Sequence, residues 1–219
     1  ARANDVIARE EWEFALAPRE TPVSWDLDPR VVAAGTVPPE WTGETVQFPQ
    51  AFFRGDYLLV VNTKAGDPVT LTLQLNPLGR EWAQLFYVVH DPAGVRLSGG
   101  GIKERTAQVT FTPEVDGLHL IGLSAGDWGG AWRIISSNAP VGIEWRESLH
   151  TMRGASRLYF DVPEGLETVS LRASGSAAET VRGILRNPAG QVLADEQTSA
   201  GTTSVTLTTP AAPGAWSVE

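Results

Sequence analysis

The sequence predicts an all-β protein built from two tandem antiparallel β-sandwiches, preceded by an extended N-terminal strap. Three observations lead to this prediction. Segments of the two halves match each other at a constant spacing, apolar and polar residues alternate with period two, and helical periodicity is nearly absent. The 219 residues are enough for two small domains or one large β domain.

The internal match is clearest between residues 91–112 and residues 187–208. The segment DPAGVRLSGGGIKERTAQVTFT aligns with NPAGQVLADEQTSAGTTSVTLT at a constant offset of 96 residues. We interpret the match as an internal duplication, because self-similarity at a fixed spacing is the signature of repeated domains. The resulting division is a strap at 1–50, a first half at 51–145 and a second half at 146–219. The eight identical pairs are Pro92/Pro188, Ala93/Ala189, Gly94/Gly190, Leu97/Leu193, Thr106/Thr202, Val109/Val205, Thr110/Thr206 and Thr112/Thr208.

Both halves alternate as half-buried strands do. In VTLTLQL (69–75) and VSLRASG (169–175), apolar residues recur at every second position at the start of each segment. The DPAG and NPAG segments are turn sequences, because Pro fixes φ and Gly admits a left-handed residue. Strands with such turns between them indicate sandwiches of the jelly-roll or immunoglobulin-like type. In the first half we expect strands at 57–63, 69–75, 84–90, 95–98, 107–112, 118–123 and 131–137.

The strap is expected to pack on the first sandwich. Within residues 4–17, Trp12, Phe14 and Leu16 alternate with Glu11, Glu13 and Ala15, which favours a strand; a short helix capped by Asn4 is the alternative. The segment WDLDP places Asp26 and Asp28 on one face of an extended stretch, where two carboxylates could contribute oxygens to calcium. A solvated acidic turn is the alternative. No metal is assigned, and structural calcium is the one cofactor that the sequence leaves open.

Composition disfavours several kinds of partner and site. A net charge of −9 argues against nucleic acid and anionic membrane surfaces. No apolar run has the length of a membrane span. Without cysteine there is no disulfide framework and no thiolate metal site. The histidines His90, His119 and His150 lack the spacing of zinc ligands, and we interpret His90 and His119 as hydrogen-bonded strand residues.

Two short motifs match functional signatures but have structural explanations. Residues 122–126 fit G-x-S-x-G, the turn that presents the nucleophile of an esterase. That turn requires a helix directly after the serine, whereas DWGGAWRIISS continues as glycines and then an alternating strand. We therefore predict that Ser124 lies in a hairpin loop and is not a nucleophile, and that the protein is not an enzyme. The RGD triplet at 54–56 is explained by a turn before the strand at 57–63.

Tryptophan is the more informative residue type, because the chain contains eight. Trp132 and Trp216 fall in predicted strands, and we assign them to packing. Connections at 76–83, 99–106 and 124–130 share one end of the first sandwich, since successive antiparallel connections alternate ends. A flat aromatic beside hydrogen-bonding groups fits the face of a sugar, and capping of the core is the alternative role. The candidate glycan platform at this end comprises Asn76, Arg80, Glu81, Trp82, Lys103, Arg105, Asp127 and Trp128.

The second half also resembles a known family. Residues 157–195 and 205–219 contain a YFDVPEG opening, an NPAG turn and a closing PGAW strand. In these features they resemble the bacterial pre-peptidase C-terminal domain and similar jelly-roll modules. The first half departs from the pattern, with VVNTKAG at the opening and DGLHL at the close. The resemblance implies a non-catalytic accessory module of a secreted bacterial hydrolase, extracellular and covalently linked to a catalytic domain that acts on protein or polysaccharide.

These observations lead to one functional expectation and its rivals. We expect a pair of carbohydrate-binding or spacer modules whose partner is a polysaccharide or other glycan. One rival is a protein-binding or cell-surface adhesion module, which would expose an apolar patch. Another is a polysaccharide-active enzyme that uses an acidic pair. Because Glu219 falls within an expected strand, we also expect the natural chain to continue for about fifteen to twenty residues that complete the second sandwich.

Overall fold

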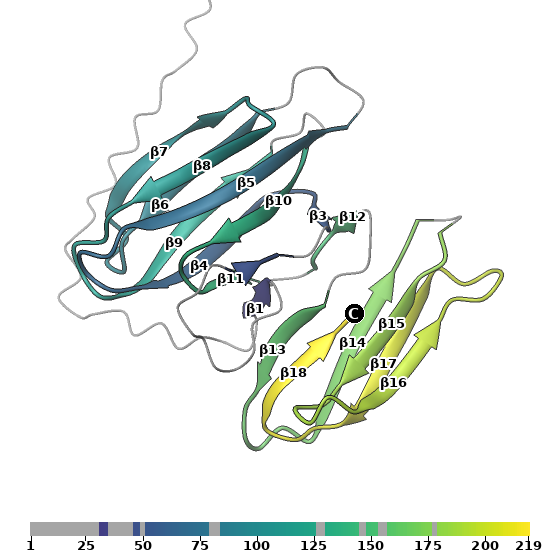
Figure 1. The fold of residues 1–219 in the computed structure, drawn as a ribbon. Coiled ribbons are helices and arrows are strands. Elements are labelled where there is room, and N and C mark those ends of the chain that lie inside the picture. The colour runs from purple at the N-terminus through teal and green to yellow at the C-terminus, as the bar shows by residue number, and fades with distance from the viewer. Residues whose placement is uncertain are drawn as a thin grey trace, which may run out of the picture.

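The computed structural model describes residues 31–34, 46–48, 51–78, 84–125, 130–144, 148–152, 157–176 and 179–219 (Figure 1). Within these ranges the chain is all-β, and its strands pair antiparallel in three sheets. A hydrophobic core cluster draws residues from all three sheets, an arrangement consistent with a β-sandwich. The predicted fold class is confirmed, whereas the strand predicted within 4–17 lies outside the described residues.

The largest sheet has ten strands and runs through both halves of the chain. Across the sheet they are β16 (Val192–Gln197), β15 (Arg182–Arg186), β18 (Gly214–Val218), β13 (Leu158–Val162), β1 (Val31–Ala34), β11 (Val141–Glu144), β4 (Tyr57–Thr63), β9 (Gly117–Ser124), β6 (Leu85–His90) and β7 (Arg96–Ile102).

Two smaller sheets complete the described structure. The six-stranded sheet is β12 (Thr151–Met152), β3 (Phe52–Phe53), β10 (Gly130–Ser137), β5 (Val69–Pro77) and β8 (Thr106–Phe111), with β2 (Val46–Gln47) also paired to β10. The two-stranded sheet consists of β14 (Thr168–Ser174) and β17 (Ser204–Pro210).

The seven strands predicted in the first half are all present. β4 has the predicted bounds, and the other strands begin and end within two residues of the predictions except at the end of β7. β7 continues through three glycines to Ile102. A Cβ on Gly99 would lie 2.9 Å from the Tyr87 carbonyl oxygen, and one on Gly100 would lie 3.3 Å from the Tyr87 ring. Glycine suits these two positions of the strand because atoms of the neighbouring strand β6 occupy the space that a side chain would need.

Strand β1 links the two halves. It pairs with β11 on one side and with β13 on the other, so Val32 lies in register with both Ile143 and Phe160. The sequence placed the strap on the first sandwich; β1 pairs with a strand of each half, and β2 pairs with β10. β12, which falls within 146–219, pairs with β3 of the first half. The ten-stranded sheet is continuous because β1 supplies this link.

The same strand order recurs in the two halves. β4-β9-β6-β7 in the first corresponds to β13-β18-β15-β16 in the second. Gly117 and Gly214 begin β9 and β18 with φ of 127° and 119°, and an added Cβ would lie 3.2 Å from Pro92 and 3.1 Å from Pro188 respectively. This recurrence supports the duplication, which stays a prediction. One strand breaks the correspondence, because β10 flanks β5 while no described strand flanks β14 in the same place.

The two tryptophans assigned to packing, Trp132 and Trp216, are fully buried. Trp132 Nε1 donates a hydrogen bond to the Gly55 carbonyl oxygen at 3.3 Å. Trp216 Nε1 donates to the Ala212 carbonyl oxygen at 2.7 Å. Each indole therefore buries its ring while its single polar atom keeps a partner, which confirms both assignments.

His119 confirms the prediction of a hydrogen-bonded strand histidine. It lies in β9, fully buried, with Nδ1 3.0 Å from Thr63 Oγ1. Its ring packs against Phe111 with the centroids 5.6 Å apart. Among the described residues, Nε2 has no hydrogen-bond partner.

Replacing Trp216 with alanine should lower the free energy of unfolding by roughly 3–5 kcal/mol, because the change leaves a cavity in the core of the second half. Denaturant unfolding followed by circular dichroism measures this value. Trp216→Phe is the matched control and should lose less, since most of the ring volume remains. A loss below about 1 kcal/mol for the alanine variant would contradict the packing role.

Replacing Val32 with proline should uncouple the two halves. Because β1 is paired on both sides, a proline at this position removes a ladder hydrogen bond whichever neighbour accepts it. We expect calorimetry to resolve separate unfolding transitions for the two halves. Val32→Ala keeps the N–H and should retain the wild-type transition; an unchanged transition in the proline variant would show that β1 is not the link.

Candidate functional site

The three connections of the predicted glycan platform do start and finish at one end of the first half. Pro77, at the end of β5, pairs with Gly130 at the start of β10. Leu85 at the start of β6 pairs with Ile102 at the end of β7. Ser124 at the end of β9 pairs with Phe86 near the start of β6. The strand ends that flank these loops therefore lie together, as alternation of antiparallel connections requires.

Three of the proposed platform residues can be placed at this end. Lys103 and Arg105 are exposed, and the Arg105 carbonyl oxygen accepts a hydrogen bond from Leu75 N at 2.9 Å. Asn76 is half-buried in β5, and its Nδ2 is buried with no hydrogen-bond partner in the part of the chain that the structure describes. The other platform residues lie outside the described residues, as do the weak calcium candidates: Arg80, Glu81, Trp82, Asp127 and Trp128 of the platform, with Asp26 and Asp28.

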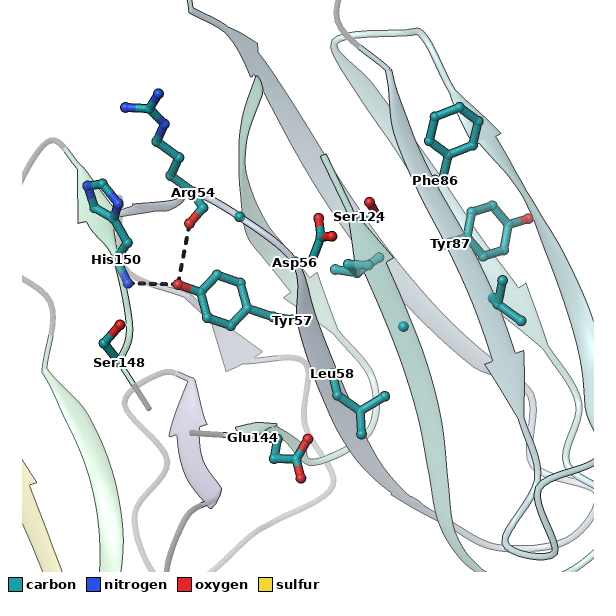
Figure 2. Close-up of a pocket in the computed structure, with 14 residues that line it drawn as sticks. Arg54, Asp56, Tyr57, Leu58, Phe86, Tyr87, Ser124, Glu144, Ser148 and His150 are labelled. Carbon is teal, nitrogen blue, oxygen red and sulfur yellow. Dashed lines mark hydrogen bonds between the residues drawn. The ribbon is translucent and has the colours of Figure 1, made fainter. Parts of the chain in front are cut away.

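A groove of about 810 Å³ lies on the outer face of the large sheet, close to the same end (Figure 2). Strands β4, β6 and β9 form its floor, and the segments before β4 and before β12 form one side. Its lining residues are Arg54, Gly55, Asp56, Tyr57, Leu58, Phe86, Tyr87, Val88, Gly122, Leu123, Ser124, Glu144, Ser148 and His150.

The floor of the groove is a row of small and apolar residues. Leu58, Gly122 and Val88 lie in register on three adjacent strands. A Cβ added to Gly122 would meet no atom closer than the Val88 carbonyl oxygen at 3.9 Å. The glycine therefore hollows the sheet surface without being required by the packing, a pattern found where a ligand approaches a strand closely.

One side of the groove is polar. The Arg54-Gly55-Asp56 segment forms the bend that was predicted before β4, with Gly55 at φ 116°. Tyr57 follows, and its hydroxyl accepts a hydrogen bond from His150 N at 2.7 Å and donates to the Arg54 carbonyl oxygen at 3.4 Å (Figure 2). The hydroxyl thus ties the segment before β4 to the one before β12.

The core of the first half holds the Tyr57 ring in place. Its centroid lies 6.0 Å from that of Phe53 and 5.9 Å from that of Trp132, both edge-on. This partial burial raises the pKa of the Tyr57 hydroxyl, and the hydrogen bond from the His150 amide opposes the rise. Tyr57 is therefore a rigid, neutral part of the groove wall.

The opposite side of the groove is aromatic. Figure 2 shows Phe86 across the groove from Arg54 and His150, with Asp56 and Ser124 between them. The Phe86 side chain is 50% exposed, one of the largest exposed apolar groups among the described residues. The groove therefore combines an accessible aromatic face with charged and hydroxyl groups on the facing side.

The structure corrects the prediction of a hairpin at the G-x-S-x-G motif. Ser124 is the last residue of β9 in the ten-stranded sheet, while β10 belongs to the six-stranded sheet. The connection therefore crosses from one sheet to the other, and an antiparallel strand follows it where a nucleophile elbow would have a helix. In Figure 2, Tyr57 and Asp56 lie between Ser124 and the His150 ring.

Sequence reasoning did not combine these residues into one site. Asp56 and Ser124 each belonged to a motif that has a structural explanation on its own, and His150 matched no motif. Phe86 carried a usable signal, because it is a large apolar residue at an outward position of an alternating strand, between the inward Leu85 and Tyr87.

Comparison with known proteins gives no relative: no family model matches the chain, and neither a curated protein nor a solved structure matches it significantly. In the described part of the chain, no helix has the length and hydropathy needed to cross a membrane. The same residues contain no cluster of three or more potential metal ligands.

The raised pKa of Tyr57 predicts a specific loss of stability in alkali. The folded state holds this proton more tightly than the unfolded state, so the contribution is fully present below pH 10.0 and is lost as pH rises through the raised pKa. Unfolding free energies measured from about pH 8 to pH 11 should fall more steeply for the wild type than for Tyr57→Phe. Parallel curves would show that Tyr57 does not titrate with a raised pKa.

Proposed function

We propose that this protein is a non-catalytic glycan-binding module pair, and that the groove on the outer face of β4, β9 and β6 binds the glycan. The observation that carries the proposal is the exposed Phe86 facing a polar side across an apolar floor. The expected setting, an accessory part of a secreted bacterial hydrolase, belongs to the same proposal.

The chemistry of the groove suits a sugar ring. A pyranose has an apolar face of C–H groups that packs on an aromatic ring, and a rim of hydroxyls that both donate and accept hydrogen bonds. Phe86 supplies the aromatic surface. Arg54, Asp56 and His150 supply charged or polar groups on the other side. The groove volume of about 810 Å³ leaves room for a ligand between the two sides.

Charge favours a neutral glycan over an acidic one. The chain carries a net charge of −9, and Asp56 and Glu144 both line the groove. Two carboxylates against the single guanidinium of Arg54 leave the lining acidic, so a uronic or sulfated polymer would meet repulsion that ordinary salt screens only in part. Neutral polysaccharides are therefore the class of ligand to test first.

The sequence-predicted platform and the groove share one end of the first half. Trp82 precedes Phe86 by four positions, and Trp128 follows Ser124 by four. The platform residues stay part of the proposal as a second contact region for a longer glycan, with the groove as the primary site.

Phe86→Ala should weaken binding to neutral polysaccharides by roughly tenfold or more, because it removes most of the aromatic surface, while leaving thermal stability close to the wild type. Gly122→Val should also weaken binding, since valine suits a strand and its side chain would occupy the groove. Affinity electrophoresis on a polysaccharide panel measures both variants.

Val192→Ala is the matched control, because Val192 is 48% exposed on β16 and distant from the groove in sequence and sheet order. Unchanged binding in both groove variants, or an equal loss in the control variant, would assign the glycan to another surface. No binding by the wild type across the panel would favour the spacer role.

Hydrolysis is the second candidate, because Asp56 and Glu144 bring two carboxylates to one groove. Glycoside hydrolysis uses two such groups, one as acid and the other as base or nucleophile. Release of reducing ends from a bound polysaccharide, lost in Asp56→Asn and Glu144→Gln, would establish this activity in place of simple binding.

A further inference from the structure

The outer face of the ten-stranded sheet continues past the groove onto its edge strand β7. β6 is the last strand of the groove floor, and β7 pairs with β6 on the side away from β9. Among the described residues, no strand pairs with the other edge of β7. The surface beside β6 that lies outside the groove therefore reaches the border of the sheet.

Glycine lies in register with the two outward residues of β6 that line the groove. Phe86 is opposite Gly101, and Val88 is opposite Gly99. Residues that are directly opposite each other in neighbouring strands share one face of the sheet. The positions of β7 opposite Phe86 and Val88 therefore carry no Cβ on the outer face.

Two polar side chains from nearby positions lie over these glycines. A Cβ on Gly99 would come within 2.7 Å of Arg96 Nη2, and one on Gly101 would overlap with Gln84 Nε2. The Arg96 guanidinium and the Gln84 amide therefore occupy the places on the outer face where side chains of residues 99 and 101 would stand. In the part of the chain that the structure describes, neither group has a hydrogen-bond partner or an ion pair.

These two groups suit the hydroxyls of a sugar. A guanidinium donates hydrogen bonds in a fixed fork, which can reach two neighbouring hydroxyls, and an amide both donates and accepts, as a hydroxyl does. Together with Phe86 they repeat the combination found in the groove, an apolar surface beside polar groups. From β4 to β7 the surface spans three strand spacings, roughly 14 Å, which is longer than one sugar ring.

We propose that the glycan site extends over β6 onto β7, where Gln84 and Arg96 bind a further part of a linear polysaccharide whose chain crosses the strands. This inference rests on the proposed glycan-binding function and narrows its ligand to linear chains longer than the groove. Because β7 is the edge strand among the described residues, the polysaccharide can continue past the sheet. Internal segments of a polymer therefore bind, and a chain end is not required.

The test measures how affinity depends on chain length, by isothermal titration calorimetry with cello-, manno- and xylo-oligosaccharides from disaccharide to hexasaccharide. In at least one series the wild type should bind the hexasaccharide roughly tenfold or more tightly than the disaccharide, because only longer chains reach β7. Arg96→Ala should lower hexasaccharide affinity about tenfold, the loss expected for a hydrogen bond to a charged group, and Gln84→Ala should lower it severalfold. Both variants should bind the disaccharide as the wild type does, whereas Phe86→Ala should weaken binding at every length.

Arg172→Ala is the matched control, because Arg172 is an exposed arginine of β14 in the second half and its loss changes the net charge equally. This variant should bind every length as the wild type does. Three results would overturn the extension onto β7 and leave the groove as the glycan site: affinity that does not rise with length, unchanged hexasaccharide affinity in Arg96→Ala and Gln84→Ala, or an equal loss in Arg172→Ala. Failure of the wild type to bind any oligosaccharide would overturn the proposed function itself, and the extension with it.

Discussion

The alternation of side chains along β4, β6 and β9 is the constraint on which both the core and the groove depend. Leu59, Val89 and Ile121 point inward from these strands and are fully buried. Their neighbours in the chain face outward, and among them Gly122 forms part of the groove floor. A slip of one residue would exchange the two sets, because side chains alternate with period two. Burial of the inward residues therefore fixes the geometry of the outer face, although the groove itself contributes little to the core.

Alternation is also the reason that most strands of the first half could be predicted from the sequence. A segment such as 69–75 carries its own pattern, so its position follows without knowledge of its partners. β1 carries no comparable pattern, since VVAA is short and apolar throughout. Its pairing with β11 and β13 depends on which edges the rest of the fold leaves free, and no local sequence pattern encodes that.

The candidate site was harder to predict for the same physical reason. Its residues come from four separate parts of the chain, around 54–58, 86–88, 122–124 and 144–150, and the register of β4, β9 and β6 brings three of these parts together. Taken one at a time, the RGD triplet is explained by the bend at Gly55, and the G-x-S-x-G match by a connection between two sheets. No local sequence pattern predicts the pairing of β4 with β9, which places Asp56 and Ser124 on one surface.

The position of β1 has a consequence for how the chain reaches its folded state. Val32 leaves the ribosome long before its partners Ile143 and Phe160, so this part of the sheet closes over a large separation in sequence. The first half can assemble β4 to β10 from contacts between residues that are closer in sequence. Meanwhile the edges of β11 and β13 that pair with β1 stay unpaired until the N-terminal segment adds to them. During that interval the β1 of another molecule can take the same place. Exchange of the N-terminal segment between chains is thus the characteristic misfolding route for this architecture at high protein concentration.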